Sequence, residues 1–233
     1  MTTKNMRASI AKRALLLALA GWCATASATV IYDYTGPDTA IPDANANGVA
    51  FNFSYTGDIT AIDSMTVTLN ISGGWNGDLY IYLTHGDGFA VLVNRIGRTL
   101  GSDLGSPISG FTTVMFSDTG ANGDIHSAAG SSITGAWEPD GRFIDPASAL
   151  DTTPRTALLS SFDGLNPDGS WTLFVADLSG GDMSMLTDFS VDVTPVPEPV
   201  NVALAIFAGL AVASYAIRRR CSGKLVDENA NRG

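Results

Sequence analysis

Several loops of this chain combine aspartate, asparagine and glycine as oxygen-rich metal sites do. Asp43-Ala44-Asn45-Ala46-Asn47-Gly48 matches the opening of a calcium-binding EF-hand loop, but the twelfth position is Ser54 rather than glutamate. Two further loops offer the same oxygen chemistry and contain Asp118, Asn122 and Asp124 in one and Asp177 and Asp182 in the other. Calcium takes about six to eight oxygen ligands from flexible loops. These acids are therefore either calcium ligands or turn-forming and solubilising residues.

Residues for nucleophilic or acid–base catalysis are few. The chain has two histidines, His85 and His126, and neither lies in a serine-protease motif or near a Gly-x-Ser-x-Gly elbow. His85 lies between Leu83 and Gly86, which predicts a solvent-facing turn residue. Pairs of carboxylates catalyse glycoside hydrolysis. With so many acidic residues in the chain, however, some carboxylates must lie close together by chance, so a pair is no evidence of catalysis. We therefore expect a protein that is not an enzyme, with a cryptic hydrolase as the catalytic alternative.

The centre of the chain is strongly acidic. Residues 29–199 contain 21 acidic residues and four arginines, a formal net charge of −17. Such a body repels phosphate backbones, so nucleic-acid binding is not expected. Cys23 and Cys221 both lie outside this stretch, which excludes a disulfide or a cysteine zinc site within it. Its stability must come from packing alone.

Residues 1–28 have the three parts of a secretory signal peptide. Four basic residues precede an apolar run that begins at Ala14, and Ala26 and Ala28 supply the small residues that signal peptidase accepts. We expect cleavage after Ala28 and export of the remainder. An N-terminal membrane anchor is the alternative, although the apolar run is short for one.

The C-terminal region predicts a transmembrane helix. Residues 200–217 contain no charge and would span about 27 Å as a helix, just enough for the hydrocarbon core. Arg218, Arg219 and Arg220 follow directly, which by the positive-inside rule leaves residues 221–233 as a cytoplasmic tail and places the body outside. A buried core helix is the alternative.

The order of these C-terminal features resembles a known sorting signal. Pro197, Glu198 and Pro199 precede the apolar span and the arginine cluster, so residues 195–220 resemble a PEP-CTERM signal. The resemblance implies export, a single-pass inner-membrane intermediate and processing by an exosortase near the Pro-Glu-Pro. It further implies a final location at the cell surface or outside a Gram-negative bacterium that makes exopolysaccharide. The 13-residue tail is longer than this family usually carries.

Alternating apolar and polar residues dominate from residue 49 to residue 193. In one run Leu79, Ile81 and Leu83 share a face, with Tyr80 and Tyr82 on the other. We expect six further strands, at or within residues 51–55, 67–71, 90–93, 113–116, 171–176 and 189–193. Turn residues separate these runs and no long helical period appears. The pattern predicts an all-β domain, either a β-sandwich or a jelly roll.

Three motifs resemble the P domain (Homo B domain) that follows the catalytic domain of subtilisin-like proprotein convertases. They are Trp75-Asn76-Gly77-Asp78-Leu79-Tyr80-Ile81-Tyr82-Leu83, Phe116-Ser117-Asp118 and the run from Phe162 to Asp177 followed by Gly181-Asp182. The most specific part of the last is Asn166-Pro167-Asp168-Gly169-Ser170-Trp171-Thr172-Leu173. The resemblance implies a jelly-roll β-sandwich over residues 29–194, without an active site of its own. Some P domains bind calcium, and acids recur at four motif positions here, Asp78, Asp118, Asp177 and Asp182.

The last of these motifs also has a plain structural interpretation. Asn166-Pro167-Asp168-Gly169 fits a type I turn, which leads Trp171 into a strand. Trp171 shares a face there with Leu173 and Val175, so we expect it in the core. Residues 121–151 form an insertion relative to the family, and their loops are the least predictable.

The favoured function is an exported, non-enzymatic surface or extracellular-matrix protein. Its sandwich would bind exopolysaccharide or a cell-surface protein, and calcium is the one cofactor considered. The alternatives are an accessory module acting with a separate subtilisin-like protease, and the cryptic hydrolase. Tyr80, Tyr82 and Trp137 either stack on sugars or pack against the second sheet.

Overall fold

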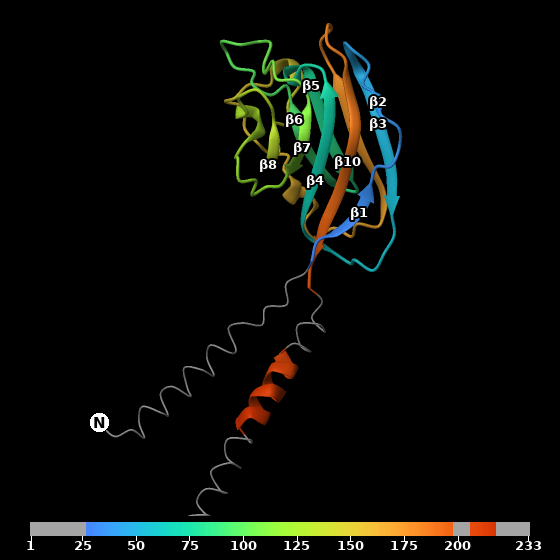
Figure 1. Cartoon of the computed structure of the whole chain (residues 1–233), viewed down its shortest axis with the longest axis vertical. Helices are drawn as coiled ribbons and strands as arrows, with labels where there is room; N and C mark the ends of the chain where they lie inside the picture. Colours follow the sequence, from blue (N-terminus) through green and yellow to red (C-terminus); the bar gives the residue numbers. More distant parts are fainter. Residues whose placement is uncertain (1–26, 198–205, 218–233) are drawn as a thin grey trace, which may run out of the picture. The chain divides into compact units, whose positions relative to one another are not determined.

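The computed structural model describes residues 27–197 and 206–217. The first range forms a two-sheet β-sandwich, in which β4 and β10 run side by side through the middle of one sheet (Figure 1). All of its strands and its buried hydrophobic cluster lie within Ser27–Val196. We therefore expect this unit to fold on its own.

The larger sheet has the strand order β1-β10-β4-β7-β8, and β2 also pairs with β10. Its strands are β1 (Thr29–Asp33), β2 (Thr39–Ala40), β4 (Ile62–Gly73), β7 (Phe111–Phe116), β8 (Thr134–Trp137) and β10 (Ser184–Pro195). All pairs are antiparallel except β7 with β8, which is parallel. Because Thr29 lies opposite Val193, the domain begins and ends at the same end of the sandwich.

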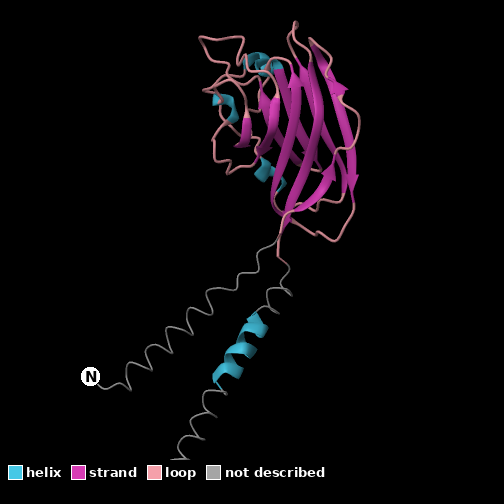
Figure 2. Cartoon of the chain, viewed as in Figure 1, coloured by secondary structure: helices cyan, strands magenta, loops and turns pink. Residues whose placement is uncertain are grey.

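The smaller sheet has the order β3-β9-β5-β6 and is antiparallel throughout. Its strands are β3 (Asn45–Tyr55), β5 (Leu79–His85), β6 (Gly88–Asn94) and β9 (Gly169–Asp177). Short 3-10 turns connect the strands at their margins (Figure 2) and are η1 (Asn76–Asp78), η2 (Ile125–Ser127), η3 (Pro146–Ser148) and η4 (Leu159–Phe162).

All seven strands expected from the alternation are present. The observed strands extend the expected runs by a few residues, since the backbone ladder continues past the apolar residues. The alternation did not reveal β1, β2 or β8, which have two to five residues each. Strands this short show too few alternating positions to stand out from a loop.

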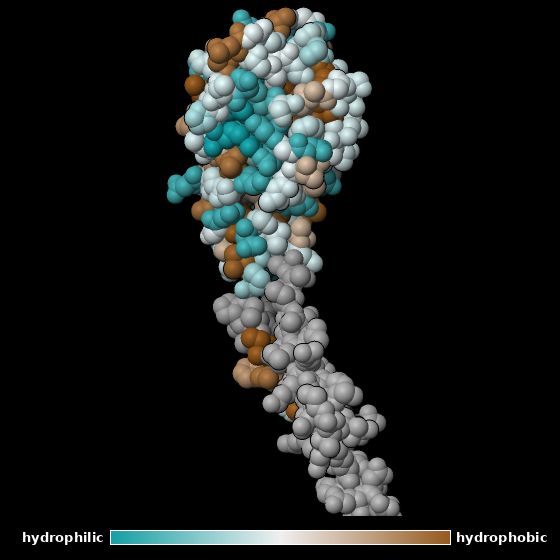
Figure 3. Space-filling view, turned by 90° about the vertical axis from the view of Figure 1, so that its left-hand side faces the viewer, coloured by the Kyte–Doolittle hydropathy of each residue, from teal (hydrophilic) through white to brown (hydrophobic). Residues whose placement is uncertain are grey.

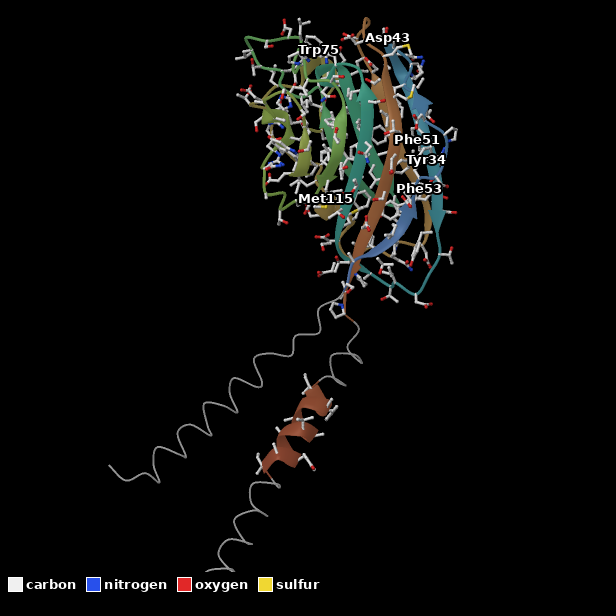
Figure 4. All side chains as sticks on the ribbon, viewed as in Figure 1. Tyr34, Asp43, Phe51, Phe53, Trp75 and Met115 are labelled. Carbon is white, nitrogen blue, oxygen red and sulfur yellow. The ribbon has the colours of Figure 1, made fainter. Side chains whose placement is uncertain are left out.

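The core lies between the two sheets, where apolar residues of alternate positions meet. An aromatic cluster closes the side of the sandwich on which β1 lies near β3. There Tyr32 stacks on Phe53 at 4.0 Å between ring centroids, and Tyr34 contacts both Phe51 and Phe189. Figure 4 shows Tyr34, Phe51 and Phe53 gathered at this side. The strand expected at residues 51–55 thus packs its aromatic residues against the core.

Trp171 is fully buried, as predicted. His85 is not the solvent-facing turn residue that its neighbours suggested. Its ring is only 7% exposed and stacks on Trp171 at 4.0 Å, and its two nitrogens lie 2.9 and 2.8 Å from the carbonyl oxygens of Ser170 and Asn166. The turn prediction failed because His85 is the last residue of β5, directly opposite Trp171 in the sheet.

The second described range is a helix over residues 206–217. It covers part of the predicted membrane span. Among the described residues, no helix is both long and apolar enough to cross a membrane. Residues 1–26, Glu198, Pro199 and Arg218 to Arg220 lie outside the described residues, so the predicted signal peptide and most of the sorting signal remain predictions.

We expect Trp171→Ala to destabilise the domain severely. The indole packs against Phe53, Phe162 and His85, and its Nε1 donates to the Pro167 carbonyl oxygen at 2.9 Å. Truncating a buried tryptophan costs about 3–5 kcal/mol. Urea unfolding of residues 27–197 measures this loss. The half-buried Trp75 supplies the control, and a Trp171→Ala loss no larger than that of Trp75→Ala would contradict the packing described.

Candidate ligand-binding groove

The outer face of the smaller sheet is aromatic. Along β5, Leu79, Ile81 and Leu83 are buried, so Tyr80 and Tyr82 point away from the core. Phe174 lies opposite Tyr82 on β9 and stacks on it at 4.8 Å with an interplanar angle of 17°. These rings do not pack against the second sheet. The packing interpretation of Tyr80 and Tyr82 is therefore excluded.

Two more rings extend this surface. Phe89 of β6 lies 5.1 Å from Tyr82, and the exposed Phe143 lies 5.3 Å from Phe89. Trp137, the third aromatic considered from the sequence, is instead on β8 of the other sheet, where its Nε1 donates to the Thr134 carbonyl oxygen. The sequence thus indicated two members of the aromatic surface. The alternation along β9 likewise places Phe174 on the outer face, between the buried Leu173 and Val175.

A groove of about 430 Å³ lies over these rings, within the size range of small-molecule sites. It is lined by Ala46, Tyr80, Tyr82, Arg95, Asp145, Pro146, Ala147, Phe174 and Leu178. The residues from 145 to 147 belong to the segment 121–151, the insertion expected from the P-domain resemblance, and nothing in the sequence indicated that they would lie beside β5.

The groove wall formed by residues 145–147 is held by buried side chains. Nη1 of Arg98 donates to the Pro146 carbonyl oxygen at 2.7 Å. Nδ2 of the buried Asn94 donates to the carbonyl oxygens of Arg142 and Ile144. The Asp145 carboxylate accepts the Ala147 N–H at 2.8 Å and so caps η3. The wall is therefore anchored to β6 and the segment after it.

Arg95 and Tyr80 provide the polar chemistry of the groove. Burial and the nearby Arg98 lower the pKa of Arg95, while Asp78 opposes this. Burial, Tyr82, Asp140 and Asp145 raise the pKa of Tyr80, so its phenol is protonated at neutral pH and can donate a hydrogen bond.

A buried ionic network supports the insertion behind this wall. His126 Nδ1 lies 2.7 Å from Asp140, its Nε2 lies 2.9 Å from the Arg98 carbonyl oxygen, and Arg142 contacts both Asp140 and Asp124. The surface on the β8 side carries a hydrophilic patch (Figure 3).

The pKa of His126 is raised. Burial disfavours its charged imidazolium form, but the hydrogen bond and the negative charge of Asp140 outweigh this effect. The stabilising contribution of this histidine is complete below the unfolded pKa and is lost as pH rises through the folded value.

The four calcium candidates have different surroundings. Asp118 accepts the N–H groups of Leu159 and Ser160 at the start of η4, and Asp78 pairs with Arg95 at 3.4 Å. Asp177 is fully buried, whereas Asp182 is exposed in the turn between β9 and β10. Within residues 27–197 and 206–217, no three His, Cys, Asp or Glu side chains form a group suited to a metal ion. Calcium binding remains a prediction.

Asp177 is electrostatically unusual. Burial, with smaller contributions from Asp78 and Asp43, raises its pKa to about 6, although the Ser179 N–H and the Ser184 hydroxyl oppose the shift. The folded protein thus holds this proton more tightly than the unfolded chain does. Stability is therefore lost as pH rises from about 3.8 through about 6.

Comparisons with known proteins identify no family for this chain. No family model matches the chain, and no curated protein matches it. Among solved structures, the Aeromonas sobria serine protease matches with a TM-score of 0.39 and 14% identity, and a chain of its complex with the chaperone matches with 0.40 and 14%. Each match covers 78% of this chain but only 29% of the other. Likeness at this level identifies neither a family nor an activity.

We expect Asp177→Asn to stabilise residues 27–197 at pH 8 by roughly 1–3 kcal/mol, because it removes a buried carboxylate whose pKa is raised. The gain should vanish near pH 4, where the folded wild type is protonated. Thermal unfolding in chelator at both pH values measures this. A destabilised variant at pH 8 would contradict it.

The same pair of proteins tests the calcium prediction. Wild type and Asp177→Asn are melted with calcium, magnesium or chelator at equal ionic strength, since screening alone also helps an acidic domain. A calcium ligand at Asp177 predicts a calcium-specific rise in the melting temperature of the wild type only. Equal melting of the wild type in all three solutions would leave the four aspartates as capping and solubilising residues.

Proposed function

We propose that this chain is an exported, non-enzymatic surface protein whose β-sandwich binds a glycan in the groove over Tyr80, Tyr82 and Phe174. The observation that carries the proposal is the aromatic outer face of β5 and β9, which no second layer covers within the described residues. In an ordinary antiparallel sheet with one solvated face, that face is polar.

Sugar recognition fits the chemistry of this surface. The ring faces of tyrosine and phenylalanine provide flat apolar area, and the phenol groups provide hydrogen bonds at the edges. Tyr82 and Phe174 stack face to face, and the outward part of this pair provides apolar contact surface in the groove together with Tyr80. The groove wall at Pro146 and Ala147 adds a side against which a ring can rest.

The finer assignment of the fold is also part of this proposal. We assign residues 29–194 as a P-domain-like jelly roll on the motifs around Trp75, Asp118 and Trp171. These motifs have structural roles here: Asp118 caps η4, and Trp171 lies in the core. A binding module of this kind needs no catalytic residues of its own.

Sorting to the cell surface completes the proposal. The chain would pass the inner membrane after cleavage behind Ala28, stay anchored by residues 200–217, and be processed by an exosortase near Glu198. The support is the order of the three C-terminal sequence features. Release outside the cell would bring the groove to the exopolysaccharide.

We expect purified residues 27–197 to bind the exopolysaccharide of the producing cell, and Tyr82→Ala to weaken binding at least about tenfold, or about 1.4 kcal/mol. Calorimetry or tyrosine fluorescence measures the affinity. Trp137→Ala is the matched control, since Trp137 is an aromatic residue on the other sheet. Equal losses in both variants would remove the groove from the proposal. Absence of glycan binding, with a co-purifying protease instead, would favour the accessory-module alternative.

Glu198→Ala tests the sorting step. We expect the full-length chain to accumulate in the inner membrane, because the exosortase would no longer recognise its motif. Immunoblots of membrane and external fractions measure this, and a substitution in the tail, Glu228→Ala, is the control. A variant that is processed and released like the wild type would rule out this sorting route.

A further inference from the structure

Arg95 is the one basic side chain among the described residues that line the groove. It follows β6 directly, and its backbone N–H donates to the Leu79 carbonyl oxygen at 2.8 Å. Its φ of +50° lies in the left-handed region, which is unfavourable for a residue other than glycine. Strain of this kind persists where the surroundings impose it, and it is enriched at ligand sites.

The guanidinium of Arg95 is fixed from one side only. Nε donates to the Gly77 carbonyl oxygen at 2.9 Å, and Nη2 donates to the Ser179 hydroxyl at 3.3 Å and to Asp78 at 3.4 Å. Nη1 has no hydrogen-bond partner in the described part of the chain, and the atom is accessible to solvent. Two N–H groups of an oriented, largely buried cation are therefore left for a ligand.

The other charged group that lines the groove is Asp145. Asp145 is held as the cap of η3 by the Ala147 N–H. Tyr80 is a protonated phenol and therefore a donor as well as an acceptor. The free donors of Arg95 and Tyr80 favour a ligand that brings acceptors, and a charged acceptor forms stronger hydrogen bonds with a guanidinium than a neutral one does.

We propose that the groove binds an acidic saccharide, a uronic acid residue of a polysaccharide, whose carboxylate pairs with Nη1 of Arg95 while its sugar ring contacts the stacked pair of Tyr82 and Phe174. This inference rests on the proposed glycan-binding function and names the ligand class. Asp78 contacts Nη2 of Arg95 and leaves Nη1 free, and exposed charges beyond about 8 Å are largely screened at physiological salt. The contact with Arg95 is far shorter than that.

The test compares one oligomer with and without its carboxylates. Residues 27–197 are titrated with a hexamer of galacturonic acid, and with the same hexamer after chemical reduction of its carboxyl groups, at 0.15 M salt. We expect the acidic hexamer to bind at least about tenfold more tightly. Arg95→Gln should lower its affinity to that of the reduced hexamer, and Arg95→Lys, which keeps the charge but not the planar fork, should keep part of the difference.

The outcomes separate this inference from the proposed function. Equal binding of both hexamers, with a loss in Tyr82→Ala, would overturn the acidic ligand and leave the glycan groove standing. Binding of the cell's exopolysaccharide but of neither hexamer would also overturn the acidic ligand. Absence of binding to every glycan would overturn both. If Arg95→Gln does not fold, the comparison of the two hexamers on the wild type still decides.

Discussion

The antiparallel register between β5 and β9 is the constraint on which the smaller sheet depends. It places His85 opposite Trp171, Leu83 opposite Leu173 and Tyr82 opposite Phe174. A slip of one residue would turn the tyrosines of β5 into the core and its leucines into solvent. The stack of His85 on Trp171 ties this register to the core, because the histidine also contacts the backbone of the chain that enters β9. One pairing thus specifies both the packed interior and the aromatic exterior.

The arginines of the acidic domain are concentrated where its least regular segment must be held. All four basic residues between residues 29 and 199 contact carboxylates of that segment or of its neighbours: Arg95 with Asp78, Arg98 with Asp103, Arg142 with Asp124 and Asp140, and Arg155 with Glu138 and Asp124. The pair of Arg142 with Asp140 is buried, whereas Asp103 is exposed. Arg98 also donates to the Pro146 carbonyl oxygen and so holds the loop that becomes the groove wall.

The alternating strand pattern made the fold predictable, but it predicted the positions of only some of the candidate functional residues. Tyr80 and Tyr82 were visible as the outward half of an alternating run, since a strand has two faces and one of them is buried. The prediction for His85 was wrong because its neighbours in sequence are turn residues, whereas its contacts come from residues 166–171, about 80 positions later. The roles of Asp118 and Asp177 were equally undetermined, because a cap and a buried acid look the same in sequence.

The sequence by itself determined the all-β class, seven of the strands, the acidic character of the domain and which residues of β5 and β9 are buried. These properties depend on period-two alternation and on composition, which are local. Tertiary structure alone decided that Phe174 from β9, Arg95 after β6 and residues 145–147 of the insertion meet over Tyr80 and Tyr82. That meeting depends on strand order and on long-range hydrogen bonds such as Arg98 to Pro146. Residues brought together across 48 positions leave no periodic trace in the chain.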